Sequence, residues 1–338
     1  MRKIEEITDK KVWEDYIQNS QISFSPFFQS WDWGELQKNL GNTVFRLGLY
    51  DDKILVGVCH AVSIQAKRGR YLHLRHGPIL TDFTNSFDDM LAVVKEKAKD
   101  LKLDFIRMSP LLDTTFFDKQ FFKSRGFRNA PVHNMDAENT WVLELDKSEE
   151  ELLAGMRKTT RYLVKKAQGM SIAITATTSQ KDFDEFLALY KATSLRHSFV
   201  PHRGLREELE IFAKDNHAKL FLARYDGKLI AGALVLFYGN QAVYHHAASD
   251  TTYREVPAAY LLQWEAIKEA KKQQKALYNF WGVVPPEKTK HPWQGLTLFK
   301  TGFGGRRLNF IHAQDLPLTP KYWKTFVIET LWRIKRGY

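Results

Sequence analysis

The chain contains one sequence pattern twice, and this repeat is the strongest constraint on its fold. Three segments of the first half return in the second half in the same order: 49–57 (LYDDKILVG) as 224–232 (RYDGKLIAG), 122–127 (FKSRGF) as 299–303 (FKTGF), and 13–16 (WEDY) as 183–186 (FDEF). The partners lie about 170 to 177 residues apart, which is far longer than the period of a solenoid repeat. We therefore predict two copies of one domain, with a ligand-binding cleft between the copies.

Length and charge bear on the number of domains and on the partners. The chain has 338 residues, which is more than one hydrophobic core normally supports, so two domains are expected. Its formal net charge is +11, and this favours binding to polyanions or anionic surfaces. Nucleic acid, nucleotide phosphates and acidic lipid head groups all fit, and a charge that serves only solubility is the remaining alternative.

The cysteine content and the N-terminus bear on the location of the protein. Cys59, the one cysteine, lies in an apolar run, which predicts a buried strand thiol and excludes disulfides and thiolate metal clusters. The first ten residues (MRKIEEITDK) lack the apolar core of a signal peptide. No segment approaches the length of a membrane span. We therefore expect a cytoplasmic protein.

Each copy predicts the same mixed α/β order of helix, hairpin, strand, helix and strand. The predicted elements are, in the first copy, 10–19, 44–49 with 54–64, 71–74, 86–101 and 103–108, and in the second copy, 180–196, 220–225 with 229–237, 242–247, 257–272 and 277–281. Asp226-Gly227 between two apolar runs is a typical hairpin turn. This order is that of the N-acetyltransferase-like (GNAT) fold, so the predicted fold class is α/β (α+β) with two GNAT-like domains.

A basic segment joins the two copies. Ser148 and Glu151 have the spacing of a capping box, so a helix is predicted over 148–168. One side of this helix is apolar and another is basic, the first with Leu152, Met156, Leu163 and Ala167, the second with Arg157, Lys158, Arg161, Lys165 and Lys166. Neighbouring like charges weaken a helix, and a phosphate partner would offset this effect. The segment therefore predicts either an anion-binding surface or a solvated helix face.

A second candidate site surrounds one lysine. The segment 295–307 (GLTLFKTGFGGRR) predicts an apolar strand followed by a glycine-rich turn, with Lys300 between them. The glycines match neither a P-loop nor a dinucleotide fingerprint. Phe299 and Phe303 flank Lys300, and a cation held among aromatic rings in a cleft stabilises a developing oxyanion. We hypothesise this role for Lys300.

Several motifs of known chemistry are absent from the sequence. The residues before the long predicted helices, 81–87 (TDFTNSF) and 253–260 (YREVPAAY), contain no glycine, so the backbone cannot wrap a pyrophosphate, and coenzyme A is not expected as a donor. No Gly-x-Ser-x-Gly elbow or His-Glu-x-x-His helix occurs. His245 and His246 are adjacent on a predicted strand and should point to opposite faces, so no metal site is expected.

Seven segments spread over most of the chain carry a family resemblance. They are 28–38 (FQSWDWGELQK), 76–78 (HGP), 157–166 (RKTTRYLVKK), 244–249 (YHHAAS), 257–264 (PAAYLLQW), 280–282 (FWG) and 298–305 (LFKTGFGG). In this order and at this spacing, they resemble the Fem family of peptidoglycan bridge-forming aminoacyltransferases, in particular its compact FemX type.

The resemblance implies both an architecture and an activity. It implies two tandem GNAT-like domains without a coiled-coil arm: 1–145, completed by a returning C-terminal helix within 316–338, and 146–315. The implied activity is the transfer of an amino acid from aminoacyl-tRNA to the stem peptide of a peptidoglycan precursor, either UDP-linked or lipid-linked. We expect a monomer without a cofactor that works in the cytoplasm, at the inner face of the plasma membrane, with peripheral contact to the membrane surface.

The resemblance also assigns roles to residues. It makes Lys300 catalytic, as the group that stabilises the oxyanion. It places Arg203 and Lys38 at the phosphates of the precursor and Tyr244 in the peptide groove, and the expected substrate-binding residues are Lys38, Arg203, Tyr244, His246 and Phe299. The charge pattern assigns tRNA binding to Arg157, Lys158, Arg161 and Lys165. The sequence departs from the family at Ser109, where an acidic residue can stand, and at Glu207 and His246, where the compact relative has tyrosines.

The implied reaction needs little chemical machinery. An aminoacyl ester is already activated, so the enzyme has to align a peptide amine with it and stabilise the tetrahedral oxyanion. No metal, cofactor or protein nucleophile is required for this reaction. Two alternatives stay open: a GNAT-like N-acyltransferase that uses another acyl donor, and a non-catalytic protein of the same fold that binds tRNA or the precursor.

Overall fold

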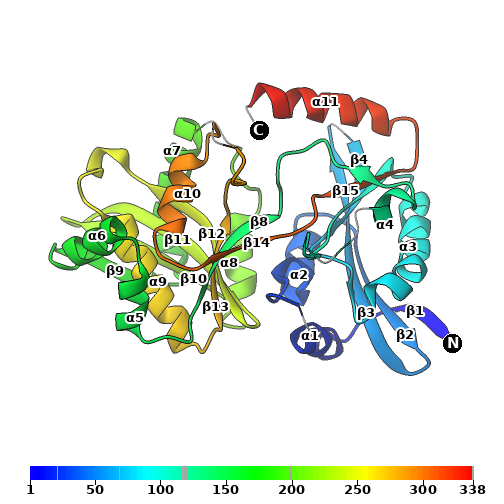
Figure 1. The fold of residues 1–338 in the computed structure, drawn as a ribbon, viewed down its shortest axis with the longest axis horizontal. Helices are drawn as coiled ribbons and strands as arrows, with labels where there is room; N and C mark the ends of the chain where they lie inside the picture. Colours follow the sequence, from blue (N-terminus) through cyan, green and yellow to red (C-terminus); the bar gives the residue numbers. More distant parts are fainter. Residues whose placement is uncertain are drawn as a thin grey trace. The chain divides into compact units, whose positions relative to one another are not determined.

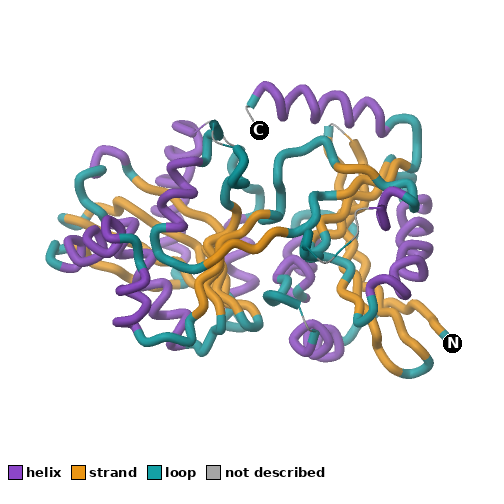
Figure 2. Tube along the Cα trace, in the orientation of Figure 1, coloured by secondary structure: helices purple, strands orange, loops and turns teal. Residues whose placement is uncertain are grey.

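Two units make up the chain, each with one mixed sheet and its own helices (Figures 1 and 2). The computed structural model describes residues 1–20, 22–67, 69–115, 117, 120–197, 200–288 and 290–336. The first unit contains Met1–Asn139, Val284–Pro292 and Leu308–Tyr338, and the second contains Thr140–Val283 and Trp293–Arg307. The predicted fold class, mixed α/β with two related domains, is confirmed.

The first unit is built on a sheet with the strand order β1-β2-β3-β4-β6-β15-β7, in which β5 also pairs with β3. Its strands are β1 (Arg2–Glu6), β2 (Val44–Asp51), β3 (Ile54–Ala66), β4 (Gly69–Arg75), β5 (Ile79–Leu80), β6 (Phe105–Ser109), β7 (Arg128–Asn129) and β15 (Gln314–Pro317). Its helices are α1 (Lys10–Asn19), the 3-10 helix η1 (Phe27–Gln29), α2 (Trp31–Asn39), α3 (Phe83–Asp100), α4 (Gln120–Lys123) and α11 (Tyr322–Lys335). α3 packs on the sheet face that carries Cys59, and α1 packs on the face that carries His60.

The second unit is built on a sheet with the strand order β14-β8-β13-β12-β11-β10-β9. Its strands are β8 (Asn139–Glu144), β9 (Ile172–Thr177), β10 (Ala218–Tyr225), β11 (Lys228–Tyr238), β12 (Gln241–Ser249), β13 (Leu277–Gly282) and β14 (Arg306–Asn309). Its helices are α5 (Glu149–Gly155), α6 (Lys158–Gln168), α7 (Gln180–His197), α8 (Leu205–Ala213), the 3-10 helix η2 (Thr251–Tyr253), α9 (Ala258–Lys272) and α10 (Gln294–Thr301). α9 and α6 cover one face, and α7 and α8 cover the other.

Strand pairing decides where one unit ends and the next begins. β8 pairs with β13, so the chain enters the second sheet several residues before the predicted boundary at 145. The first unit resumes at Leu308, ahead of the predicted 316, and it also includes 284–292.

The repeat seen in the sequence is present in the structure. In each unit a hairpin, β2–β3 or β10–β11, is followed by a strand, a long helix and a second strand that pairs in parallel with the first. The hairpin turns contain Asp52 (φ 53°) and Asp226 (φ 49°) in the left-handed conformation. Gly227 (φ 74°) gives the second turn the two positive φ angles that a type I′ turn requires. The predicted helices and strands of both copies are confirmed.

The single helix predicted over 148–168 is wrong, because the structure has two helices here. The capping box of Ser148 and Glu151 is present and begins α5. Met156 is extended (φ −70°, ψ 149°), and α6 begins two residues later. In a continuous helix the Arg157 N–H would bond within the helix, whereas here it donates to the Gly302 carbonyl at 2.9 Å. A contact with a distant segment therefore ends the first helix.

The apolar strand predicted before Lys300 is also wrong, because this segment is the helix α10. Leu296 and Leu298 have the two-residue spacing of a strand, but they are 43% and 59% exposed. Phe299 and Phe303 have the four-residue spacing of a helix, and their ring centroids lie 5.3 Å apart. Lys300 lies in the last helical turn and is buried.

The lengths of the helices bear on two structures, a long helical arm and a membrane-spanning helix. The helices α7 and α8 have 18 and 9 residues, so neither is long enough to form the coiled-coil arm that the sequence was expected to lack. Within the described ranges, no helix has both the length and the apolar composition that crossing a lipid bilayer requires.

The C-terminal segment returns to the first unit, as predicted, and buried ion pairs hold it there. Arg107 on β6 donates two hydrogen bonds to Asp315 on β15, at 2.7 and 2.8 Å, and two to Glu329 on α11, at 2.7 and 3.4 Å. The Tyr322 hydroxyl donates to Asp315 at 3.1 Å. Burial opposes the charge of Arg107, but the two carboxylates outweigh burial and raise its pKa. Residues 337 and 338 of the predicted C-terminal helix lie outside the described residues.

Removal of the Arg107 side chain should destabilise the protein strongly. In Arg107→Ala, Asp315 stays buried without its cation, a change that typically costs about 3–5 kcal/mol. The measurement is the free energy of unfolding of the full chain in urea. Arg254→Ala is the matched control, because Arg254 pairs with Glu255 at 3.6 Å with side chains 83% and 89% exposed. If Arg107→Ala were no less stable than this control, the anchoring role would be refuted.

Candidate functional site

Lys300 lies buried in the second unit, in the last turn of α10. The residue is 4% exposed, and its Nζ donates a hydrogen bond to the Gly282 carbonyl oxygen at 2.7 Å. Among the residues that the structure describes, no carboxylate forms an ion pair with it. Burial lowers the pKa of Lys300 to about 7. A buried lysine without a carboxylate partner is costly for folding, which makes Lys300 a candidate functional group.

The carbonyl that receives Lys300 belongs to an irregular strand end. The pairing of β13 with β8 shifts its register between Asn279 and Gly282. Between them, Trp281 has a φ of 68°, a left-handed conformation that bulky residues rarely adopt. The Asn279 side-chain oxygen supports this bend, since it accepts hydrogen bonds from the Trp281 N–H (2.9 Å) and the Thr140 hydroxyl (2.7 Å). Strained backbone of this kind clusters at functional sites, so the end of β13 is a candidate site in its own right.

Aromatic rings surround the C-terminal end of α10. The Phe299 ring lies 4.9 Å from Tyr260 and 5.3 Å from Phe303, centroid to centroid, and Phe303 lies 5.4 Å from Phe280. Phe303 and Phe280 belong to the second core, and Phe299 packs against it while staying partly exposed. The rings therefore exclude water from one side of α10, and substrate binding by Phe299 stays a prediction.

The first copy provides an internal comparison for Lys300. The repeat aligns Phe122-Lys123 with Phe299-Lys300, and both lysines lie at the end of a short helix, α4 or α10. Lys123 is exposed, whereas Lys300 is buried. The environment of the side chain, and not the local sequence motif, therefore distinguishes Lys300.

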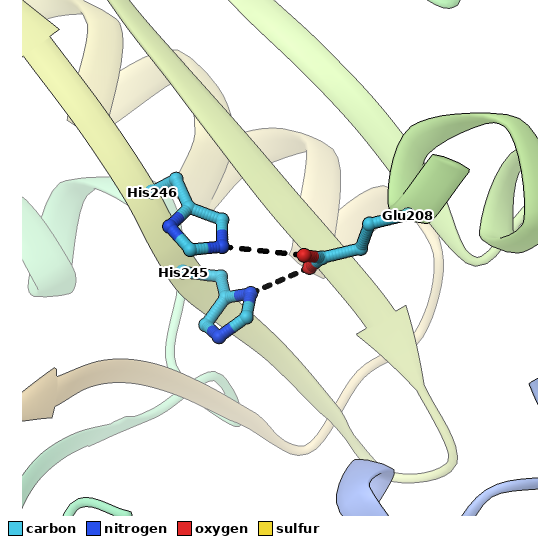
Figure 3. A group of neighbouring side chains, drawn as sticks. All are labelled: Glu208, His245 and His246. Carbon is cyan, nitrogen blue, oxygen red and sulfur yellow. Dashed lines mark hydrogen bonds and ion pairs between the residues drawn. The ribbon is translucent and has the colours of Figure 1, made fainter. Parts of the chain in front are cut away.

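A second buried polar cluster connects α8 with β12 (Figure 3). His245 Nδ1 lies 2.6 Å from Glu208 Oε1, and His246 Nε2 lies 3.2 Å from Glu208 Oε2. The three side chains are 4 to 6% exposed. Burial opposes the ionisation of Glu208, but the two histidines outweigh it and hold the pKa of this carboxyl well below its usual range.

The prediction that His245 and His246 point to opposite faces is wrong. In the ladder between β11 and β12, Leu234 pairs with His246 and the next residue of β11 pairs with Tyr244. His245 is thus the extra residue of a β-bulge, which breaks the alternation of the strand. Both rings consequently turn toward Glu208, and their centroids lie 4.0 Å apart. No motif in the sequence signals the bulge or brings Glu208 to the pair.

The cluster and Lys300 both border the end of β13, within the second unit. The His245 ring meets the Trp281 ring edge-on, with centroids 5.6 Å apart. Lys300 binds the carbonyl of the next residue, Gly282. A buried ionic cluster and a buried lysine thus adjoin one strained strand end, and this end is the candidate functional site.

The other predicted substrate-binding residues lie apart from one another. Tyr244 packs against the core on the α9 side of the sheet, and burial raises its pKa. His246 faces α8, so the second sheet separates it from Tyr244. Arg203 is exposed in the turn before α8. Lys38 belongs to the first unit, where it is half exposed on α2.

Ser109, where the family resemblance allows an acidic residue, binds a carboxylate from another segment. Its hydroxyl donates to Asp136 Oδ2 at 2.5 Å, and Arg75 Nε donates to Asp136 Oδ1 at 2.8 Å. Burial opposes the ionisation of Asp136, but Arg75 and His73 hold its pKa well below the usual range. The first unit therefore has a buried carboxylate next to position 109 after all. No motif marks Asp136 in the sequence.

The basic residues of 157–165 fall into two groups. Arg157 precedes α6, and its guanidinium donates to the Leu298 carbonyl at 3.0 Å, so it lies off the helical face on which it was predicted. Lys158, Arg161 and Lys165 follow one another at three- and four-residue spacing along α6. We call these three residues the α6 basic stripe. The opposite side of α6 is buried, with Thr160, Val164 and Ala167.

The start of α3 is unsuited to a pyrophosphate. The Asp82 carboxylate caps this helix and accepts a hydrogen bond from the Asn85 N–H at 3.1 Å. A negative charge already lies where the amides of the helix would bind an anion. In the second copy, Pro257 stands at the start of α9 and offers no N–H.

The chain has relatives among known proteins. The FemAB family model matches residues 122–228 and 202–329. The UDP-N-acetylmuramoylpentapeptide-lysine N(6)-alanyltransferase of Weissella viridescens is 23% identical over 228 residues, in a match that covers 63% of this chain and 67% of that protein.

Solved structures share the whole fold. A crystal structure of FemX superposes with a TM-score of 0.80 at 18% identity, covering 97% of this chain and 100% of that chain. A tandem GNAT protein from the clavulanic acid biosynthesis pathway superposes with a TM-score of 0.58 at 11% identity, covering 95% and 99%. With the family model matched over more than half of its residues, the chain belongs to the FemAB family.

Proposed function

We propose that the protein is a tRNA-dependent aminoacyltransferase of peptidoglycan cross-bridge synthesis. It moves an amino acid from aminoacyl-tRNA to the stem peptide of a UDP-linked or lipid-linked precursor. The observation that carries this proposal is the Lys300 side chain, buried with its Nζ on the Gly282 carbonyl at the strained end of β13. Family membership supports it, and so does the Weissella relative, whose name describes alanyl transfer to the lysine of UDP-N-acetylmuramoylpentapeptide.

The proposed reaction is an aminolysis of the aminoacyl ester. The amine nitrogen of the stem peptide attacks the ester carbonyl carbon, so that a C–N bond forms and the ester C–O bond breaks. The amine loses a proton, and the tRNA hydroxyl leaves with one. Lys300 stabilises the oxyanion of the tetrahedral intermediate, and its charge acts more strongly in a buried site of low dielectric constant than in water.

We assign the acceptor and the donor to different residues. Arg203 and Lys38 are assigned to the phosphates of the precursor, and Phe299 with Tyr244 to its peptide. These assignments come from the family resemblance. His246 lies on the opposite face of the second sheet from Tyr244 and is left out of this peptide contact. The α6 basic stripe binds the phosphates of the tRNA, because its cations share one helical face and its opposite face is buried. Arg157 adds to the stripe from its position before α6.

Lys300→Met should remove most of the transferase activity and leave the fold intact. Loss of a contact to the oxyanion typically lowers kcat by about 10²–10³-fold. The measurement is peptide-bond formation from charged tRNA to a UDP-linked or lipid-linked precursor. Lys123→Met, the same change at the exposed equivalent of the first copy, is the matched control and should keep wild-type turnover.

Three outcomes of this assay would overturn the proposal in different ways. Turnover of Lys300→Met within a few-fold of wild type would remove Lys300 from the mechanism. Activity with coenzyme A thioesters alone would make the protein an N-acyltransferase of another donor class. Binding of tRNA without transfer to any acceptor would make it a non-catalytic binding protein.

Lys300→Met should also abolish a pH dependence of stability. The pKa of Lys300 is about 7 in the folded protein, against 10.5 for an ordinary lysine, so between these values the unfolded chain binds more protons. Wild-type stability relative to Lys300→Met should therefore rise as pH increases from about 7 toward 10.5, and fall as pH decreases over the same window. The measurement is the urea midpoint across this range. Lys123→Met keeps Lys300, so its stability should follow the wild-type pH dependence, and parallel curves for Lys300→Met and wild type would contradict the lowered pKa of Lys300.

Replacement of the α6 basic stripe should weaken tRNA binding in a salt-dependent way. In a triple variant with Lys158→Gln, Arg161→Gln and Lys165→Gln, the slope of log affinity against log salt should fall by roughly two to three, at about 0.7–0.9 per phosphate contact. The measurement is a salt titration of tRNA binding. The control is a variant of the first unit that loses the same number of positive charges and should keep the wild-type slope: Lys95→Gln, Lys99→Gln and Lys102→Gln. Parallel lines for wild type and the stripe variant would show a solvated face.

A further inference from the structure

The cluster of Glu208, His245 and His246 has the geometry of a metal-binding site (Figure 3). One ligand atom from each residue, a carboxylate oxygen or an imidazole nitrogen, lies within 4.8 Å of the other two. The ligands come from two elements, since Glu208 is on α8 and both histidines are on β12. All three are buried, so their positions are set by packing and not by solvent.

The β-bulge at His245 is the feature that a simple ion pair does not explain. One histidine would be enough to neutralise Glu208, and a regular strand would present only one of two adjacent side chains to α8. The bulge brings the second imidazole to the same carboxylate, and His245 consequently stands as an extra residue between two that pair with β11. Bulges that re-aim a side chain occur next to functional sites, and here the result is three donor atoms around one point.

The distances suit a small divalent ion with minor adjustment. Zinc binds imidazole nitrogen and carboxylate oxygen at about 2.0–2.2 Å, so the ligands of a tetrahedral ion lie roughly 3.4 Å apart. The two nitrogen–oxygen distances in the cluster are 2.6 and 3.2 Å. The carboxylate therefore has to withdraw from His245 by less than about 1 Å to admit an ion.

The surroundings provide the support that metal ligands need. The Trp281 ring packs edge-on against His245, at 5.6 Å, and the Tyr190 ring packs edge-on against His246, at 5.9 Å. These contacts fix the planes of both imidazoles, as the outer residues of metal sites do. His202, an exposed residue, has its ring 4.8 Å from that of His246, so the cluster lies one side chain below the surface.

We propose that Glu208, His245 and His246 bind one divalent transition-metal ion, with zinc as the best match to two imidazoles and one carboxylate. Sets of two histidines and one carboxylate bind zinc or ferrous iron and leave a coordination position for water or a further oxygen ligand. The ion would tie α8 to β12. The site is independent of the proposed aminolysis, which requires no metal.

The test is zinc binding by the full-length, tag-free protein after removal of metal with a chelator. We expect one zinc ion per chain in a calorimetric titration. Glu208→Gln and His246→Ala should each weaken binding by more than about 100-fold, since loss of an outer partner alone costs 10–100-fold. His197→Ala, which removes an exposed histidine of the same unit, is the matched control and should bind as wild type does.

Two measurements on the wild-type protein keep the test decisive if a variant fails to fold. Cobalt(II), used as a spectroscopic substitute, should give visible absorption bands that zinc abolishes. The melting temperature should rise with zinc concentration, because an ion that binds only the folded state stabilises it. If the wild type binds no zinc and shows neither effect, or if Glu208→Gln binds zinc as tightly as wild type, the proposal is overturned and the cluster is a hydrogen-bonded His–Glu–His group. Transferase activity does not enter these measurements, so either proposal can fail alone.

Discussion

The ion pairs of Arg107 are the interaction on which the first unit depends. They join residues 208 and 222 positions apart in the sequence, and they bring both β15 and α11 to β6. β15 lies between β6 and β7 in the sheet, so β7 joins this sheet through its pairing with the C-terminal segment. Arg107 and Asp315 are buried together, and removing either one would leave the other charge buried without its partner. The first unit is therefore complete only when the last residues of the chain have joined it.

In the second unit, two buried charged side chains, Lys300 and Glu208, have pKa values shifted from their ordinary range. Lys300 is deprived of water, and no carboxylate of the described residues pairs with it, so that burial brings its pKa to about 7. Glu208 is also deprived of water, but two imidazoles keep it ionised. His245, one of the two imidazoles, packs against Trp281, and Lys300 binds the carbonyl of the next residue, Gly282, where the backbone of Trp281 is strained. Rigid packing around a strained strand end thus holds two opposite charges in different electrostatic surroundings.

The sequence was sufficient to predict features that depend on neighbouring residues. The capping box of Ser148, the Asp226-Gly227 turn and the periodic helices all followed from local preference, and the order of elements led to the fold. Features that depend on distant contacts could not be predicted. The first helix ends before Arg157, whose N–H bonds to the distant Gly302 carbonyl. The bulge at His245 turns its ring toward Glu208, which lies on α8. Burial of Lys300 belongs to the same class, because two copies of one motif place their lysines in opposite environments.

The equivalence of Lys123 and Lys300 in the repeat bears on the evolution of the protein. If both copies descend from one ancestral domain, Lys123 and Lys300 derive from the same ancestral lysine, and the surroundings of that lysine changed differently in the two copies. In one copy it remained a solvated charge, and in the other it was enclosed by aromatic rings and a bent strand. A new chemical property could then arise without a new residue, through changes in the neighbours of an old one.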